Sequence, residues 1–323
     1  MPRLYWVAYV LALVFAAALA IGLGTITLSA HALWDGIRGV GDPTVVSVIR
    51  VLRLPRVVLG MLVGAGLGMS GAALQGTMRN PLAEPYLVGV SGGAAVGAVL
   101  ATVLGVGVAL VPVAAFVGAI VAVLAAFAVA HVSGGRGDPR LLLMAGVVVG
   151  AFANAVIMVL LANAEPNVVR NALWWMMGSV SDASWPQIEM LAGYVAVAGV
   201  ALVVIGREID VLALGEDAAA GLGLSVDRSV RRVFLIASLL AAATVAAAGL
   251  IGFVGLVVPH LVRSSGARRH RPLLVGSAFA GATLVVLADL LGRTLRPPAE
   301  LPLGAVTALI GVPFFLLKMR RLT

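Results

Sequence analysis

The chain consists of ten long apolar segments separated by short breaks that carry most of its charge. An α-helix needs about 20 apolar residues to cross a hydrocarbon layer of about 30 Å. The chain is 61% hydrophobic and 11% charged, whereas a soluble domain is about 25% charged. These features predict an all-α, polytopic membrane protein with about ten transmembrane helices in a single domain, 1–323. The predicted spans are 5–28, 57–77, 86–105, 109–131, 141–161, 186–206, 232–249, 251–266, 273–292 and 303–319.

The first apolar segment is predicted to be a retained helix. A small-x-small sequence at 29–32 resembles a signal-peptide cleavage site, but the run before it is 24 residues long. The apolar core of a signal peptide has about 7–15 residues. Segment 5–28 is long enough to span the membrane, and we expect it to do so.

The basic residues predict the orientation of the chain. With the N-terminus inside, fifteen of the 22 basic residues lie in inner loops and seven in outer loops. Cytoplasmic loops of membrane proteins carry the excess of Lys and Arg, so both termini are expected in the cytoplasm. The net charge of +8 and the pI near 11.1 would also suit a nucleic-acid-binding protein. Because the arginines stand in short clusters between apolar spans, no nucleic-acid partner is expected.

Two stretches introduce proline, glycine and polar groups into this apolar chain. They are RNPLAEPYLVGVSGGAAVG at 79–97 and GLIGFVGLVVPHLVR at 249–263. Irregular backbone at membrane depth leaves costly unpaired polar groups unless it is buried in protein or lines a water-filled path. The two stretches therefore predict a route through the membrane.

Several chemistries are excluded by residues that the chain lacks. It contains no cysteine, and its one lysine, Lys318, is followed by methionine. A Walker loop requires Lys before Ser or Thr in a glycine-rich turn, so any ATP hydrolysis must occur on another polypeptide. The four histidines are scattered without the clustering of metal ligands. We expect a non-catalytic chain with no metal site and no cofactor of its own.

Two inner segments are candidate functional elements. Asn80-Pro81-Leu82 follows the second span, where proline disfavours helix for the preceding residue; it is either an ordinary helix-ending turn or a constriction at the inner mouth. The inner loop 207–231 contains a predicted short helix, 213–222, with Glu216 and Asp217 in its first turn. That helix suits docking to a soluble partner, and a solvated connector is the alternative.

On the outer side, Arg53, Arg56 and Arg293 form a predicted positive patch of exposed arginines. Such arginines suit pairing with a partner's carboxylates or anchoring to lipid headgroups, and spacing leaves both open. Asp289 lies in an apolar run four residues before Arg293, so an i, i+4 ion pair is as reasonable as a functional acid.

Two patterns concern packing and symmetry. Glycines at four-residue spacing, 60/64/68 and 89/93/97, indicate close helix contacts within the chain or a dimer seam. Segments 56–76 and 232–252 match at seven positions with an offset of 176. Because the two would enter from opposite sides, the match is typical of an inverted repeat; chance similarity in an alanine-rich chain is the alternative.

Seven motifs together resemble the permease subunits of type II ATP-binding-cassette importers, which take up cobalamin, haem and ferric siderophores. The resemblance covers 52–317. The motifs are LRLPR (52–56), QGTMRNPLAEPYLVGVSGGA (75–94), WWMMGS (174–179), ALGEDAAAGLGL (213–224), GFVGLVVPHLVR (252–263), ADLLGR (288–293) and ELPLGAVTALIGVPFF (300–315).

The resemblance implies a homodimer in the bacterial inner membrane, with two ATPase subunits carrying ATP and Mg on the cytoplasmic side and a periplasmic binding protein that delivers the substrate. It also assigns roles to residues of this chain. The inner gate would be Asn80 and Leu82; the path would include Asn154, Met158, Trp174 and Met177; the ATPase would dock on Leu214, Gly215, Glu216, Asp217, Gly221 and Gly223; and the binding protein would dock on Arg53, Arg56 and Arg293.

Two other classes remain as alternatives to this function. An ion- or proton-coupled secondary transporter usually carries paired ionisable residues within its spans, and an intramembrane enzyme needs paired carboxylates or histidine clusters. The predicted spans offer almost none of these residues. The sequence does not distinguish among cobalamin, haem and a ferric siderophore as the substrate.

Overall fold

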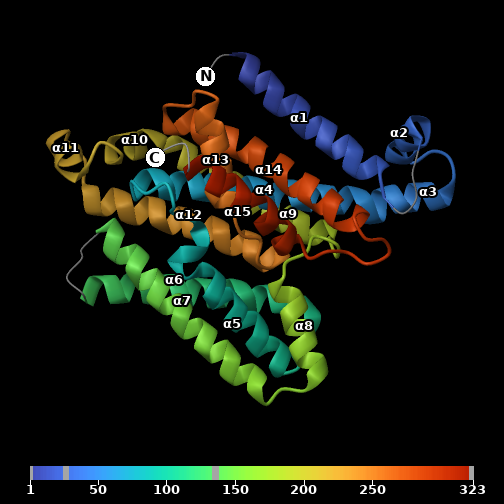
Figure 1. Cartoon of the computed structure of the whole chain (residues 1–323), viewed down its shortest axis with the longest axis horizontal. Helices are drawn as coiled ribbons and strands as arrows, with labels where there is room; N and C mark the ends of the chain where they lie inside the picture. Colours follow the sequence, from blue (N-terminus) through green and yellow to red (C-terminus); the bar gives the residue numbers. More distant parts are fainter. Residues whose placement is uncertain (1–2, 25–28, 133–137, 320–323) are drawn as a thin grey trace.

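A computed structural model describes residues 3–24, 29–132 and 138–319, and every regular element in those ranges is helical (Figure 1). The elements are α1 (Arg3–Gly22), α2 (Ala30–Arg38), α3 (Pro43–Ser47), the π-helix η1 (Val48–Arg53), α4 (Leu54–Thr77), the 3-10 helix η2 (Pro85–Val88), α5 (Val90–Val103), the 3-10 helix η3 (Val108–Leu110), α6 (Val111–Val132), α7 (Pro139–Ala162), α8 (Pro166–Met176), α9 (Trp185–Val204), α10 (Gly206–Leu212), α11 (Glu216–Gly221), α12 (Val226–Ala248), α13 (Val254–Ser264), α14 (His270–Thr294) and α15 (Leu303–Met319).

The helices are compatible with the ten predicted spans in their order along the chain. Within the described ranges, seven helical segments are long and apolar enough to cross a membrane, and three shorter apolar helices, α5, α13 and α15, occupy the positions of the third, eighth and tenth spans. The end of the first predicted span, 25–28, lies outside the described residues. The third and eighth spans begin later than predicted because η2 and the irregular backbone before Val254 replace their first turns.

The outer connection 31–56 is more helical than predicted. It contains α2 and α3, and η1 continues into α4 so that Pro43–Thr77 forms one helical run of 35 residues. The predicted inner helix 213–222 is shorter in the structure, because α10 extends to Leu212 and Gly215 adopts a φ of 115° before α11 begins at Glu216.

Three helices form the core of the molecule. The runs containing α4, α12 and α14 are 78%, 67% and 61% buried, whereas α1, α6, α7 and α9 are between 17% and 28% buried. Helix α4 packs against α9, α12, α13 and α14, and a second group consists of α5 with α6 and α7 (Figure 1). The weakly buried apolar helices surround this core, as expected for helices that face lipid.

Small residues allow the closest helix contacts. A β-carbon on Gly64 of α4 would overlap the carbonyl oxygen of Gly281 in α14, and one on Gly93 of α5 would overlap that of Gly118 in α6. These contacts identify the glycine rows as packing surfaces within the chain. Close backbone approach supplies the van der Waals contact that lipid-embedded helices need, since lipid gives no hydrophobic drive for association.

Helix α1 begins and α15 ends toward the side of α10 and α11, and α2 and α3 lie at the opposite end (Figure 1). This arrangement agrees with an even number of spans. The proposed repeat pairs α4 with α12, which lie in contact; the inverted relation itself stays a prediction.

Candidate functional site

The first irregular segment connects α4 to α5. After α4 ends at Thr77, Arg79 takes a left-handed φ of 49°. The Asn80 side-chain oxygen then accepts a hydrogen bond from the Leu82 backbone N–H at 2.9 Å, forming an Asx turn around Pro81. Leu82 is 45% exposed. Asn80 and Leu82 therefore stand on a turn just after the C-terminal end of the core helix α4, and the turn predicted there is present.

The second irregular segment connects α12 to α13. Helix α12 ends at Ala248, Gly249 has a φ of 71° and Phe253 a φ of 68°, and α13 starts at Val254. A left-handed φ is uncommon for a residue with a large side chain, and the surroundings must hold it in place. The predicted break in this stretch is present in the structure.

The two irregular segments bind each other. The Glu84 carboxylate accepts a hydrogen bond from the Phe253 backbone N–H at 2.6 Å, and the Tyr86 hydroxyl accepts one from the Ile251 N–H at 2.7 Å. The His260 ring contacts the Pro81 carbonyl oxygen at 3.0 Å. Side chains of the first segment thus satisfy backbone groups that the break in the second leaves without helical partners.

Sequence reasoning did not select Glu84 or Tyr86, although both are polar groups within an apolar stretch. It also did not select Gln75 of α4. The Gln75 amide donates to the carbonyls of Gly255 and Leu256 at 3.2 Å, and its oxygen accepts from Arg263 at 2.6 Å. Through this buried amide, α13 is fixed to the core helix α4.

The predicted docking loop forms a compact surface at the end of the bundle that carries α10 and α11 (Figure 1). Glu208 of α10 accepts hydrogen bonds from Arg232 at 2.9 Å and Ser229 at 2.8 Å, both on α12. Glu216, the first residue of α11, pairs with Arg79 at 3.1 Å. Beside α11 lies an open pocket of about 530 Å³. Its lining includes Ala220, Leu224, Asp227, Arg228 and Arg231.

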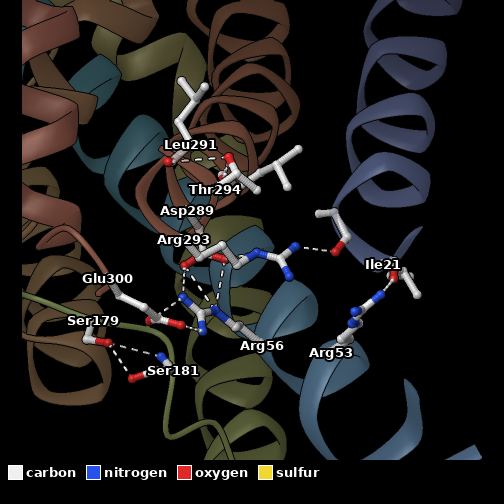
Figure 2. A network of polar contacts seen from close by, with 12 residues as sticks. Ile21, Arg53, Arg56, Ser179, Ser181, Asp289, Leu291, Arg293, Thr294 and Glu300 are labelled. Carbon is white, nitrogen blue, oxygen red and sulfur yellow. Dashed lines mark hydrogen bonds and ion pairs between the residues drawn. The ribbon is translucent and has the colours of Figure 1, made fainter. Parts of the chain in front are cut away.

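The outer arginines are engaged within the chain, which corrects the expectation of an exposed patch (Figure 2). Arg53 is 6% exposed and donates to the carbonyls of Ile21 at 2.7 Å and Gly22 at 3.1 Å, and Arg293 donates to the carbonyl of Ala20. The last carbonyls of a helix have no intrahelical partner. These two arginines therefore cap the C-terminus of α1.

Arg56 forms the centre of the same network (Figure 2). Its guanidinium makes bidentate contacts with Asp289 at 2.8 and 2.9 Å and with Glu300 at 2.9 Å. The i, i+4 pair of Asp289 with Arg293 is present but longer, at 3.6 Å. The hydrogen bond from Arg56 lowers the pKa of Glu300, which lies between α14 and α15 and remains 46% exposed.

The predicted path residues lie on α7 and around the end of α8. Asn154 and Met158 are exposed on α7, and Met158 is 73% exposed. Trp174 on α8 is 54% exposed, and the carbonyl of Met177 accepts a hydrogen bond from Gly304 at 3.0 Å. Their role in lining a path stays a prediction.

Comparison with known proteins decides the family. The model of the FecCD transport family matches residues 11–321. The chain belongs to the FecCD transport family. The resemblance to type II importer permeases, drawn from motifs, is thereby confirmed, and this FecCD chain is a multi-pass membrane permease.

Relatives cover most of this FecCD chain. It is 44% identical over 274 residues to a cobalamin import system permease protein BtuC of Halobacterium salinarum, covering 84% of this chain and 73% of the relative. It is 35% identical over 319 residues to the hemin transport system permease protein HmuU of Yersinia pestis, covering 98% and 95%. A solved metal-chelate type ABC transporter in an inward-facing conformation matches with a TM-score of 0.90 at 28% identity, covering 99% of this chain and all of that one.

The described part of this FecCD permease brings no three His, Asp or Glu side chains together in an arrangement that could hold a metal ion. Asp289, the buried acid of α14, is paired with Arg56 and Arg293. The features that the structure does show are interlocked backbone breaks and ion pairs at the two ends of the bundle.

Proposed function

We propose that this chain is the transmembrane subunit of an ATP-driven importer that carries a large metal chelate into the cytoplasm. The observation that carries the proposal is the pair of interlocked backbone breaks, 78–89 and 249–253, within a bundle that matches a metal-chelate transporter over 99% of its length. Such breaks are tolerated where they are buried in protein or line a water-filled path. The chelate belongs to the class of cobalamin, haem and ferric siderophores, because relatives named for cobalamin and hemin transport align with most of the chain.

The working assembly in this proposal contains two copies of the chain in the cell inner membrane, with both termini in the cytoplasm. Asn80 and Leu82 form the inner gate, and Asn154, Met158, Trp174 and Met177 line the path. The exposed, weakly polar surface of α7 supports this assignment, since a large chelate must slide without binding tightly.

A separate ATPase supplies the energy and docks on the surface around α11. Leu214 is 65% exposed, and Glu216 and Asp217 are also exposed on this helix. The neighbouring pocket with Arg228 and Arg231 adds charged groups for a protein partner. ATP and Mg belong to that partner, because this chain contains no Walker loop.

A periplasmic binding protein delivers the chelate at the opposite end, near Arg53, Arg56 and Arg293. Arg56 already pairs with Glu300. A carboxylate of the delivery protein must therefore compete with Glu300 for the Arg56 guanidinium. An ion- or proton-coupled transporter is less well supported, because Asp289, the buried acid of the described spans, is held in ion pairs.

Uptake in proteoliposomes tests the proposal. The purified chain, its genomic neighbour ATPase and the binding protein are reconstituted, and entry of radiolabelled cyanocobalamin, haemin and a ferric siderophore is measured with and without ATP. We expect uptake of one chelate that requires all three proteins and ATP. Uptake at the full rate by the chain alone, without nucleotide, would refute the proposal.

A further inference from the structure

The ion pair between Arg79 and Glu216 joins two elements that are distant in sequence. Arg79 Nη2 lies 3.1 Å from Glu216 Oε1, across a separation of 137 residues. Arg79 directly precedes the Asn80–Leu82 turn at the end of α4, and Glu216 is the first residue of α11. The pair therefore connects the turn at the inner mouth with the short surface helix.

The backbone adopts a positive φ at or next to both residues of the pair. Arg79 has a φ of 49°, and Gly215, immediately before Glu216, has a φ of 115°. A β-carbon on Gly215 would lie 3.4 Å from Arg79 Nη1, so the guanidinium rests against the start of α11. Non-glycine residues persist in left-handed conformations when their surroundings hold them. Here the surroundings of Arg79 include the carboxylate of α11.

The largest helix contacts of α11 are local. It packs against α10 and α12, its neighbours in the chain. Arg79 and Glu216 side chains are 37% and 50% exposed, and exposed ion pairs contribute little to stability. A weak, solvent-accessible pair between two surface elements is suited to a contact that breaks and re-forms during a conformational cycle.

We propose that the Arg79–Glu216 pair transmits movement of α11 to the Asn80–Leu82 turn. The proposal rests on the proposed function, in which an ATPase moves α11 and the turn forms the inner gate. When α11 shifts and Glu216 separates from Arg79, the left-handed backbone of Arg79 loses a contact that helps to hold it, and the adjoining Asn80–Leu82 turn can rearrange. Both residues are positioning residues: neither contacts the transported chelate in this mechanism.

The first experiment measures coupling in the complete reconstituted complex. Arg79→Gln and Glu216→Gln are each compared with wild type for chelate molecules imported per ATP hydrolysed, and ATPase co-purification is measured on the same samples. We expect the ratio to fall about two- to fivefold in both variants, the range that an exposed ion pair supplies, and we expect Arg79→Gln, which lies outside the proposed docking surface, to keep the ATPase bound. Because Glu216 also belongs to that surface, the ratio for Glu216→Gln is taken per bound ATPase. Arg232→Gln is the matched control, because its pair with Glu208 is also partly open to solvent but joins the nearby α10 and α12.

The second experiment tests the contact without any partner protein. The chain has no cysteine, so spin labels can be placed at Ala218→Cys on α11 and Leu82→Cys in the turn, both exposed positions. Dipolar broadening between the labels is expected to decrease in Arg79→Gln and in Glu216→Gln. It is expected to return in the charge-reversed pair Arg79→Glu with Glu216→Arg.

The outcomes separate the two proposals. If wild type retains no ATPase, the proposed function fails, and the spin-label experiment still decides whether the pair holds α11 against the turn. If the ATPase binds and both single variants keep the wild-type import ratio, the transmission proposal is overturned while the proposed function stands. Unchanged broadening in both single variants also overturns it.

Discussion

The Arg56 guanidinium binds the carboxylates of Asp289 and Glu300 at the same time, with its nitrogen atoms 2.8 to 2.9 Å from the nearest oxygens. Asp289 is buried, whereas Glu300 is partly open to solvent. Arg56 is thus held on one side by a fixed structural partner and on the other by one that an incoming group can replace. This relationship gives different expectations for the two carboxylates.

Replacing Glu300 with glutamine should strengthen docking of the binding protein. The neutral amide competes less well for Arg56 than a carboxylate does, so a partner carboxylate reaches the guanidinium more easily. We expect the dissociation constant to decrease about two- to fivefold, measured by surface plasmon resonance on the permease in nanodiscs. Glu165→Gln, at the exposed N-cap of α8, is the control. Weaker docking by Glu300→Gln would contradict the competition.

Reversing the charge of Arg56 should destabilise the fold as well as weaken docking. Arg56→Glu places a third carboxylate beside Asp289 and Glu300, and removing one partner of a buried pair costs about 3–5 kcal/mol. A lower midpoint of thermal unfolding in detergent is expected. Arg296→Glu, on an exposed residue of the same outer region, should leave the midpoint nearly unchanged. Unaltered stability of Arg56→Glu would show that the network is not structural.

The stability contributed by Glu300 should depend on pH. Arg56 lowers the folded-state pKa of Glu300 below its ordinary value, so this stability is fully present above the unfolded-state pKa. It is lost as the pH falls through the lower, folded-state pKa. The difference in unfolding midpoint between wild type and Glu300→Gln should therefore be constant near neutral pH and vanish in acid. A difference that grows with acidification would contradict this sign.

Removing the carboxylate of Glu84 should loosen the break before α13. Glu84→Ala leaves the Phe253 N–H without its acceptor, which costs about 1–3 kcal/mol for a buried donor. Glu84→Gln keeps a side-chain oxygen that can accept the bond and serves as the matched control. Hydrogen exchange should accelerate at the Phe253 amide in Glu84→Ala and remain close to wild type in Glu84→Gln. Equal exchange rates in all three proteins would contradict the interlock.

The close crossing of α4 and α14 should not tolerate one added methyl group. Gly64→Ala forces its β-carbon into the carbonyl oxygen of Gly281 and requires α4 and α14 to separate. Overpacking of this kind costs about 1–3 kcal/mol, and a lower unfolding midpoint is expected. Gly150→Ala on α7 is the control, because nothing lies within 4 Å of the position. Similar midpoints for the two variants would contradict the packing described for the core.

Much of the architecture could be predicted because it depends on local composition. Apolar runs long enough to cross a membrane must form helices, since no other open structure satisfies the backbone in lipid. The ten spans and the two breaks followed from this rule. Boundaries that depend on a single backbone angle did not follow, such as the start of α11 after Gly215.

The sequence by itself determined the fold class, the order of the helices, the presence of breaks within 79–97 and 249–263, and, through its motifs, the family. Only the tertiary structure decided how the polar side chains pair. Arg56 and Asp289 are 233 residues apart, and Glu84 and Phe253 are 169 apart. Residue type shows that a group needs a partner, but the partner is fixed by the packing of distant helices. For this reason the arginines expected to be exposed instead close a network with Asp289, Glu300 and the end of α1.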